Sequence, residues 1–107
     1  MKALIFCATL FAASSSFAFT TCDKWANNAR LTKAIYTVAA HEDYTFEELC
    51  TLPKILDVEA QPSHIVERDG TVIPHVRVQL HMEYSSCLYM VRDSDQVITS
   101  SRCYSGW

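Results

Sequence analysis

Cysteine content constrains this chain more than any other feature of its sequence. The chain has 107 residues and five cysteines, an odd number for a disulfide-bonded protein. Cys7 lies in an N-terminal segment that resembles a secretory signal peptide, and removal of that segment leaves Cys22, Cys50, Cys87 and Cys103. No two of these four have the C-x-x-C spacing that is common in zinc sites. In an exported protein we therefore expect two disulfides.

The N-terminal segment has the parts of a signal peptide. Lys2 is followed by an almost unbroken apolar run that ends at Ala13, and small residues precede the bond after Ala18. The run of about eleven residues is shorter than the roughly 20 that a membrane-spanning helix needs. We predict cleavage after Ala18, a mature chain of residues 19–107 that does not insert into a membrane, and a periplasmic or secreted location.

The mature chain has the length of one small domain. A domain of about 90 residues buries a modest apolar interior and is only marginally stable. Each disulfide would stabilise it by roughly 2 to 4 kcal/mol, mainly by restricting the unfolded chain. We expect a single domain that depends on its cross-links.

The first third of the mature chain has a helical pattern. One apolar stripe is formed by Leu31, Ala34, Ile35 and Val38, which predicts a helix from about residue 23 to 40 with Thr20 or Thr21 as its cap. A second helix begins at Thr45, because Thr45 and Glu48 have the spacing of a capping box. Pro53 ends this helix early, since proline disfavours helical geometry at the residue before it.

Residues from Ile55 onward alternate between apolar and polar. The first strand would bury Leu56, Val58 and Ala60, with a bulge or bend near Pro62 where the alternation changes phase. Asp69-Gly70 predicts a two-residue hairpin turn. The next strand would then bury one face, consisting of Val72, Val76, Val78, Leu80 and Met82.

Two further strands, at 87–92 and 97–104, complete an antiparallel meander of four to five strands. With the helices packed on one face of this sheet, the predicted fold class is α+β. A three-residue loop at 94–96 would place Cys87 opposite Cys103, which leaves Cys22 to pair with Cys50. This is the favoured one of three possible connectivities.

Two histidines form a candidate metal site. A two-residue turn at Asp69-Gly70 would place His64 opposite His75, with their Cβ atoms about 5 Å apart. Such a pair is a weak candidate for a divalent metal or for a pH-responsive element. Because the sequence offers no evident third ligand, the simpler interpretation is two surface histidines, and we assign no metal and no cofactor.

The polar face of the same strand has the residue types of an acid–base site. His75, Arg77, His81 and Glu83 are the kinds of residue that small secreted ribonucleases use. They are strung along one strand, however, whereas an active site needs groups that converge on one phosphate. We therefore do not predict an enzyme from them.

Net charge bears on the kind of partner. The chain has 9 basic and 12 acidic residues, so loss of Lys2 leaves 8 against 12 and a charge of −4. Basic residues do not cluster with aromatics, which argues against nucleic-acid binding. An acidic surface favours a cationic protein partner.

A rigid, acidic domain without a catalytic motif suits protein recognition. We expect a binding protein of a bacterial cell envelope, an inhibitor or immunity protein that blocks a secreted or periplasmic enzyme or toxin. Its general design is similar, as a class, to periplasmic lysozyme inhibitors and secretion-system immunity proteins. The alternatives are a small ribonuclease-like hydrolase and a metal-binding or pH-sensing envelope protein. Candidate contact residues are Asp93, Asp95, the acidic segment 42–48, His75, Arg77, His81, Glu83 and Trp107.

Overall fold

The computed structural model describes residues 21–105. The predicted cleavage site and Trp107 lie outside the described residues. The elements, in chain order, are η1 (Asp23–Trp25), α2 (Ala29–His41), α3 (Phe46–Thr51), β1 (Ile55–Val66), β2 (Val72–Met82), β3 (Ser85–Arg92) and β4 (Ile98–Ser105). This order confirms the predicted α+β class.

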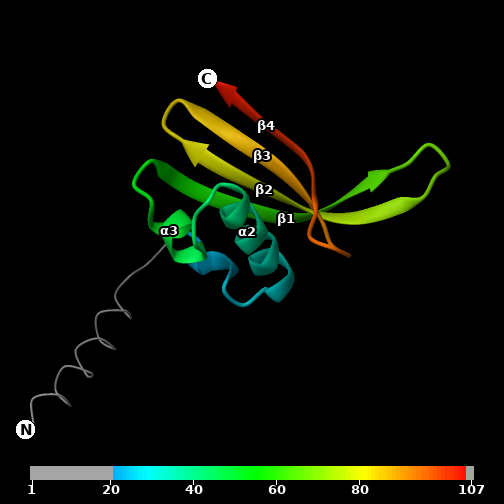
Figure 1. Cartoon of the computed structure of the whole chain (residues 1–107), viewed down its shortest axis with the longest axis horizontal. Coiled ribbons are helices and arrows are strands. Elements are labelled where there is room, and N and C mark those ends of the chain that lie inside the picture. The colour runs from blue at the N-terminus through cyan, green and yellow to red at the C-terminus, as the bar shows by residue number, and fades with distance from the viewer. Residues whose placement is uncertain (1–20, 106–107) are drawn as a thin grey trace, which may run out of the picture.

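The sheet is an antiparallel meander in the order β1-β2-β3-β4, with the helices on one of its faces (Figure 1). Helix α2 contacts β1, β2 and β3, and α3 contacts β1. The helix residues of the core are the predicted stripe with Ala39 and Leu49, and the central sheet residues are Val58, Ala60, Val76, Val78, Leu80, Tyr89 and Val91. The interior is therefore one layer between helix and sheet.

The predicted single helix at 23–40 is divided in two. Residues 23–25 form one turn of 3₁₀-helix, and the α-helix begins only at Ala29. Asn28 is the cap, because it has extended backbone geometry and its side chain accepts a hydrogen bond from the N–H of Leu31 at 3.0 Å. Thr21 does not cap the helix, since its hydroxyl donates to the Cys50 carbonyl at 3.0 Å.

Helix α3 has the predicted start and end. Thr45 accepts from the N–H of Glu48 at 3.0 Å, and Glu48 accepts from the N–H of Thr45 at 2.8 Å, which completes the capping box. Leu52, which precedes Pro53, is extended. The capping pattern and the proline rule therefore suffice to place this helix.

Both predicted disulfides are present. Cys22 bonds to Cys50 and Cys87 bonds to Cys103. The first fixes the chain before α2 to the end of α3 and is fully buried. The second joins the neighbouring strands β3 and β4.

The loop that was used to predict the second disulfide is longer than expected. The Arg92 N–H donates to the Val97 carbonyl at 2.8 Å, so the loop contains four residues, 93–96, instead of three. Thr99 is an extra residue in β4, where the register changes between Met90 and Val91. This bulge restores the pairing of Cys87 with Cys103. The error in the predicted loop length and the unpredicted bulge therefore cancel.

Strand β1 differs from the prediction in the place of its irregularity. Pro62 pairs with Val76 in regular register, and the register changes instead between Ile55 and Asp57. Leu56, which lies at that irregularity, is 59% exposed and does not join the core. Proline fits a regular edge strand where its missing N–H faces away from the neighbouring strand.

Candidate binding site

The hairpin that joins β1 and β2 extends beyond the rest of the sheet. β2 pairs with β1 from Val72 onward, but it pairs with β3 only from His75 onward. Residues 64–74 therefore form a two-stranded ribbon that projects past β3 and past the helices, as Figure 1 shows. We call residues 64–74 the projecting hairpin.

Apolar side chains occupy both faces of the projecting hairpin. Val66 pairs with Val72, and each is 57% exposed. Ile65 pairs with Ile73 on the opposite face, and both are half-buried. The prediction that Val72 is buried is wrong, because α2 does not extend over this part of β2. Exposed apolar side chains that gather on one element are typical of a protein-interaction site.

The turn at the tip is held by several hydrogen bonds. The Glu67 N–H donates to the Thr71 carbonyl at 2.8 Å, and the Gly70 N–H donates to the Glu67 carbonyl at 2.9 Å. The Asp69 carboxylate accepts from the N–H of Thr71 at 2.9 Å, and this bond lowers the pKa of Asp69 below its usual value. The tip is therefore ordered even though β3 does not pair with residues 64–74.

These bonds define a three-residue loop, 68–70, instead of the predicted two-residue turn. A type I′ turn requires positive φ at both Asp69 and Gly70, but of these two only Gly70 has it, at 91°. The longer loop shifts the register by one residue, so that His64 faces Pro74 and Ser63 faces His75. The predicted pairing of His64 with His75 is wrong, because the Asp69 side chain favours a turn that begins one residue earlier.

His75 is buried instead of lying on a polar surface. Its ring is 1% exposed, with Nδ1 at 2.9 Å from the Ile73 carbonyl and Nε2 at 2.9 Å from the Thr99 hydroxyl. Among residues 21–105, no group of three or more His, Cys, Asp or Glu side chains is arranged to hold a metal ion.

The other residues of the predicted acid–base set do not converge with His75. Arg77 and His81 are half-buried on the sheet face opposite the helices, four residues apart on one strand. His81 Nε2 lies 3.2 Å from a Glu59 carboxylate oxygen, and Glu83 lies beyond the end of β2. Because Arg77 and His81 are four residues apart on one strand, roughly 13 Å, the four side chains do not converge on one point.

The two aspartates of the predicted binding loop make ion pairs within the molecule. Asp93 accepts from Nε of Arg30 at 2.6 Å, and Arg30 also donates to the His75 carbonyl at 3.0 Å. Asp95 accepts two hydrogen bonds from Arg92, both at 2.9 Å, and these bonds lower the pKa of Asp95. Asp93 thus joins α2 to the sheet, and Asp95 orders the loop.

The acidic segment 42–48 borders a pocket of about 200 Å³ between α3 and the sheet. The Tyr89 hydroxyl donates to the Glu42 carboxylate at 2.8 Å at this pocket. Burial, together with this bond, raises the pKa of Tyr89 well above its usual value. Apolar side chains such as Leu49, Leu80 and Met82 form most of the wall. Glu42 therefore has a structural partner within the fold.

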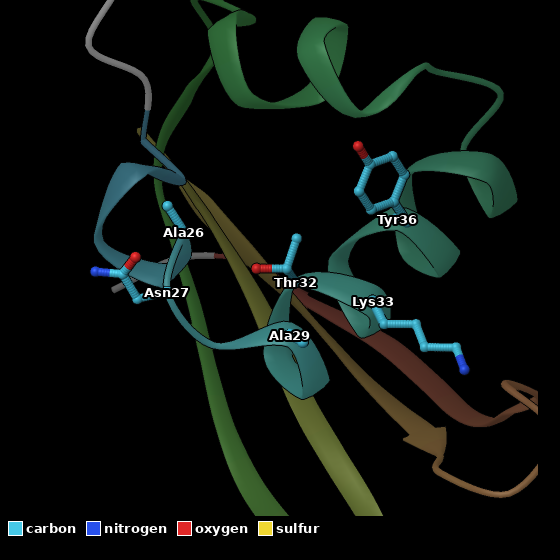
Figure 2. A pocket seen from close by; sticks show the side chains of 6 residues that line it. All are labelled: Ala26, Asn27, Ala29, Thr32, Lys33 and Tyr36. Atoms are coloured by element: carbon cyan, nitrogen blue, oxygen red, sulfur yellow. The ribbon is translucent and has the colours of Figure 1, made fainter.

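A shallower pocket lies beside the first turns of α2 (Figure 2). Its lining residues are Ala26, Asn27, Ala29, Thr32, Lys33 and Tyr36. The Thr32 hydroxyl donates to the Trp25 carbonyl at 2.7 Å, and the Tyr36 ring stacks on Phe46 at 4.3 Å. In Figure 2 the Lys33 side chain points away from Asn27. The polar groups do not converge, so we assign no ligand to this pocket.

Comparison with known proteins adds no relative. No family model, no curated protein and no solved structure matches the chain. No helix within residues 21–105 has the length and hydropathy of a membrane span. The two disulfides are consistent with a secreted or periplasmic protein.

Proposed function

We propose that this protein is an inhibitor or immunity protein that inserts its projecting hairpin into a cleft of a secreted or periplasmic enzyme. The observation that carries this proposal is the exposure of Val66 and Val72 on a two-stranded ribbon that pairs with no third strand within residues 21–105. A two-stranded ribbon alone is marginally stable in water. This one is continuous with two strands of a disulfide-linked domain, so it is presented in an ordered conformation.

An ordered hairpin favours binding for an entropic reason. A segment that is already in its bound shape loses little conformational freedom on association, so more of the contact energy appears as affinity. Apolar side chains on both faces suit a cleft that contacts the ribbon from two sides. The acidic balance of the chain favours a partner of opposite charge.

The test uses two variants that differ only in where an exposed apolar side chain becomes charged. Val66→Lys alters the projecting hairpin. Leu56→Lys is the matched control, because Leu56 is 59% exposed, is also on β1 and lies at the opposite end of that strand. Neither of these side chains is buried, so both variants should keep the fold, which circular dichroism verifies.

The disulfide-bonded proteins would be used to capture partners from envelope and culture fractions of the source organism. We expect the wild type and the Leu56 variant to retain a stoichiometric hydrolase or toxin and to inhibit its activity. The hairpin variant should lose both properties. Retention and inhibition by a folded hairpin variant would exclude the proposed site, and absence of any inhibited enzyme would exclude the function.

A further inference from the structure

The two edges of the sheet use their backbone groups differently. On β1, the Val58 carbonyl accepts from the Trp25 indole N–H at 2.9 Å, and the Val58 N–H donates to the Asp57 carboxylate at 3.0 Å. Pro62, four residues further along the same edge, has no N–H to offer. Side-chain capping and proline are devices that prevent an edge strand from pairing with another chain.

Within residues 21–105, the β4 edge has no comparable protection. Residues 99–105 are all exposed. The Cα atoms of Cys87 and Cys103 are 4.0 Å apart, which is the close spacing of a non-hydrogen-bonded antiparallel pair. The backbone groups of Cys103 therefore point away from β3, and those of Ser101 and Ser105 do the same because the pattern repeats every two residues. Within residues 21–105 no group bonds to them from the open side.

We propose that β4 pairs with β4 of a second copy of this chain, antiparallel, around a two-fold axis at Cys103. In this register Cys103 pairs with its own counterpart, and Ser101 pairs with Ser105 of the second copy. All the outward N–H and C=O groups of these three residues are then satisfied. The contact is the same surface on both copies, so the assembly closes as a dimer.

Side chains favour this register over its neighbours. Arg102 is the only charged residue of β4, and it faces Tyr104 of the second copy in the proposed register. Arg102 already lies over its own Tyr104 ring, with the guanidinium carbon 5.9 Å from the ring centroid, so the two groups are compatible neighbours. An axis at Arg102 would place two arginines opposite each other, which is unfavourable. An axis at Ser101 would leave the Ser105 groups unpaired.

The consequence is one continuous sheet made of two four-stranded sheets. The projecting hairpin lies on the β1–β2 side of each copy, so the two-fold axis separates the two hairpins and leaves both accessible. The dimer is independent of the proposed function, since neither needs the other.

The test is sedimentation velocity of the disulfide-bonded protein over a wide range of micromolar concentrations. We expect a monomer–dimer equilibrium. Ser101→Pro removes one outward N–H from each copy and should weaken association by about tenfold or more, while Ser101→Ala retains that N–H and should associate like the wild type. Proline is tolerated where the N–H is unused, so the monomer should stay folded. If Ser101→Pro fails to fold, Ser105→Pro at the strand end replaces it.

Amide hydrogen exchange locates the contact. The N–H groups of Ser101, Cys103 and Ser105 should exchange more slowly as the concentration rises. Three results would overturn the proposal: a monomer at every concentration, a dimer that persists in a folded proline variant, or concentration-dependent protection at the projecting hairpin in place of β4.

Discussion

Among single residues, His75 shows how a buried polar ring obtains hydrogen-bond partners. A carbonyl can only accept, so Nδ1 carries the proton that it donates to Ile73, and Nε2 faces the Thr99 hydroxyl. Thr99 is the extra residue of the β4 bulge. The bulge therefore provides the side chain that satisfies His75, and it links the second strand to the fourth.

Tyr89 is the second informative residue. Its raised pKa means that the fold favours the neutral phenol, because burial and the bond to Glu42 oppose ionisation. In the unfolded chain the phenol ionises near pH 10. The stability that the neutral Tyr89 phenol contributes to the fold is therefore complete below about pH 10 and is lost as the pH rises above that value.

We expect Tyr89→Phe to lower the free energy of unfolding by about 1 kcal/mol at neutral pH, because it removes one hydrogen bond. Between about pH 10 and 12 the wild type should lose stability more steeply than the variant. Urea unfolding at several pH values measures both effects, with Tyr84→Phe as control because Tyr84 is highly exposed. Equal slopes for wild type and Tyr89→Phe would contradict this account.

At the scale of elements, the position of α2 depends on a cap that is not at the predicted threonines. Asn28 has the extended geometry of a cap, and its side chain bonds to the Leu31 N–H. The disulfide instead holds Cys22 at the end of α3, and the indole of Trp25 holds η1 beside β1. Because of these tertiary contacts, α2 begins at Ala29 and not at about residue 23 as predicted.

Asn28→Ala should lower the free energy of unfolding by about 1 kcal/mol, the usual cost of losing a cap. Asn27→Ala is the matched control, since it is the adjacent and exposed residue of the same type and is not the cap. Chemical unfolding followed by circular dichroism compares the two. If both variants lose the same stability, Asn28 is not the cap that fixes α2.

At the scale of the whole molecule, the two disulfides differ in accessibility. Cys22 and Cys50 are both buried in the core, whereas Cys87 is half-buried and Cys103 is exposed. The loops they close span 28 and 16 residues, and each cross-link should contribute about 3 to 4 kcal/mol. Together the two contributions are a large part of the total free energy of unfolding of a small domain, which is roughly 5 to 15 kcal/mol.

A mild thiol reductant should therefore open Cys87–Cys103 first, because only that bond can be reached without unfolding. Alkylation followed by peptide mass analysis identifies the free thiols at each time. We expect Cys22 and Cys50 to react only as the near-native circular dichroism is lost. Early modification of Cys22 in a folded protein would show that burial does not protect it.

Local patterns explain why much of the fold was predictable. The capping box at Thr45, the proline at 53 and the apolar stripe from Leu31 to Val38 each depend on neighbouring residues, and each was confirmed. The strand periodicity also gave the correct sheet class. Register was less predictable, because one residue in a loop shifts every later pair.

The candidate site shows the limit of sequence reasoning. Val66 and Val72 have an ordinary strand pattern, and nothing adjacent to them indicates that β3 stops short of the hairpin. Their exposure depends on the lengths of β3 and α2 relative to β2. Likewise, His75 contacts Thr99 only because a bulge shifts the register of β4 by one residue.

By itself the sequence determined the element types and the meander, since these follow from short-range periodicity and caps. The cysteine pairing was predicted correctly, but it depended on a longer loop and a bulge that offset each other. The tertiary structure alone decided which strand edge is open, which hairpin projects and which histidine is buried. Those properties depend on register and on where one element ends relative to another, and such distances are set by packing between segments that are remote in the chain.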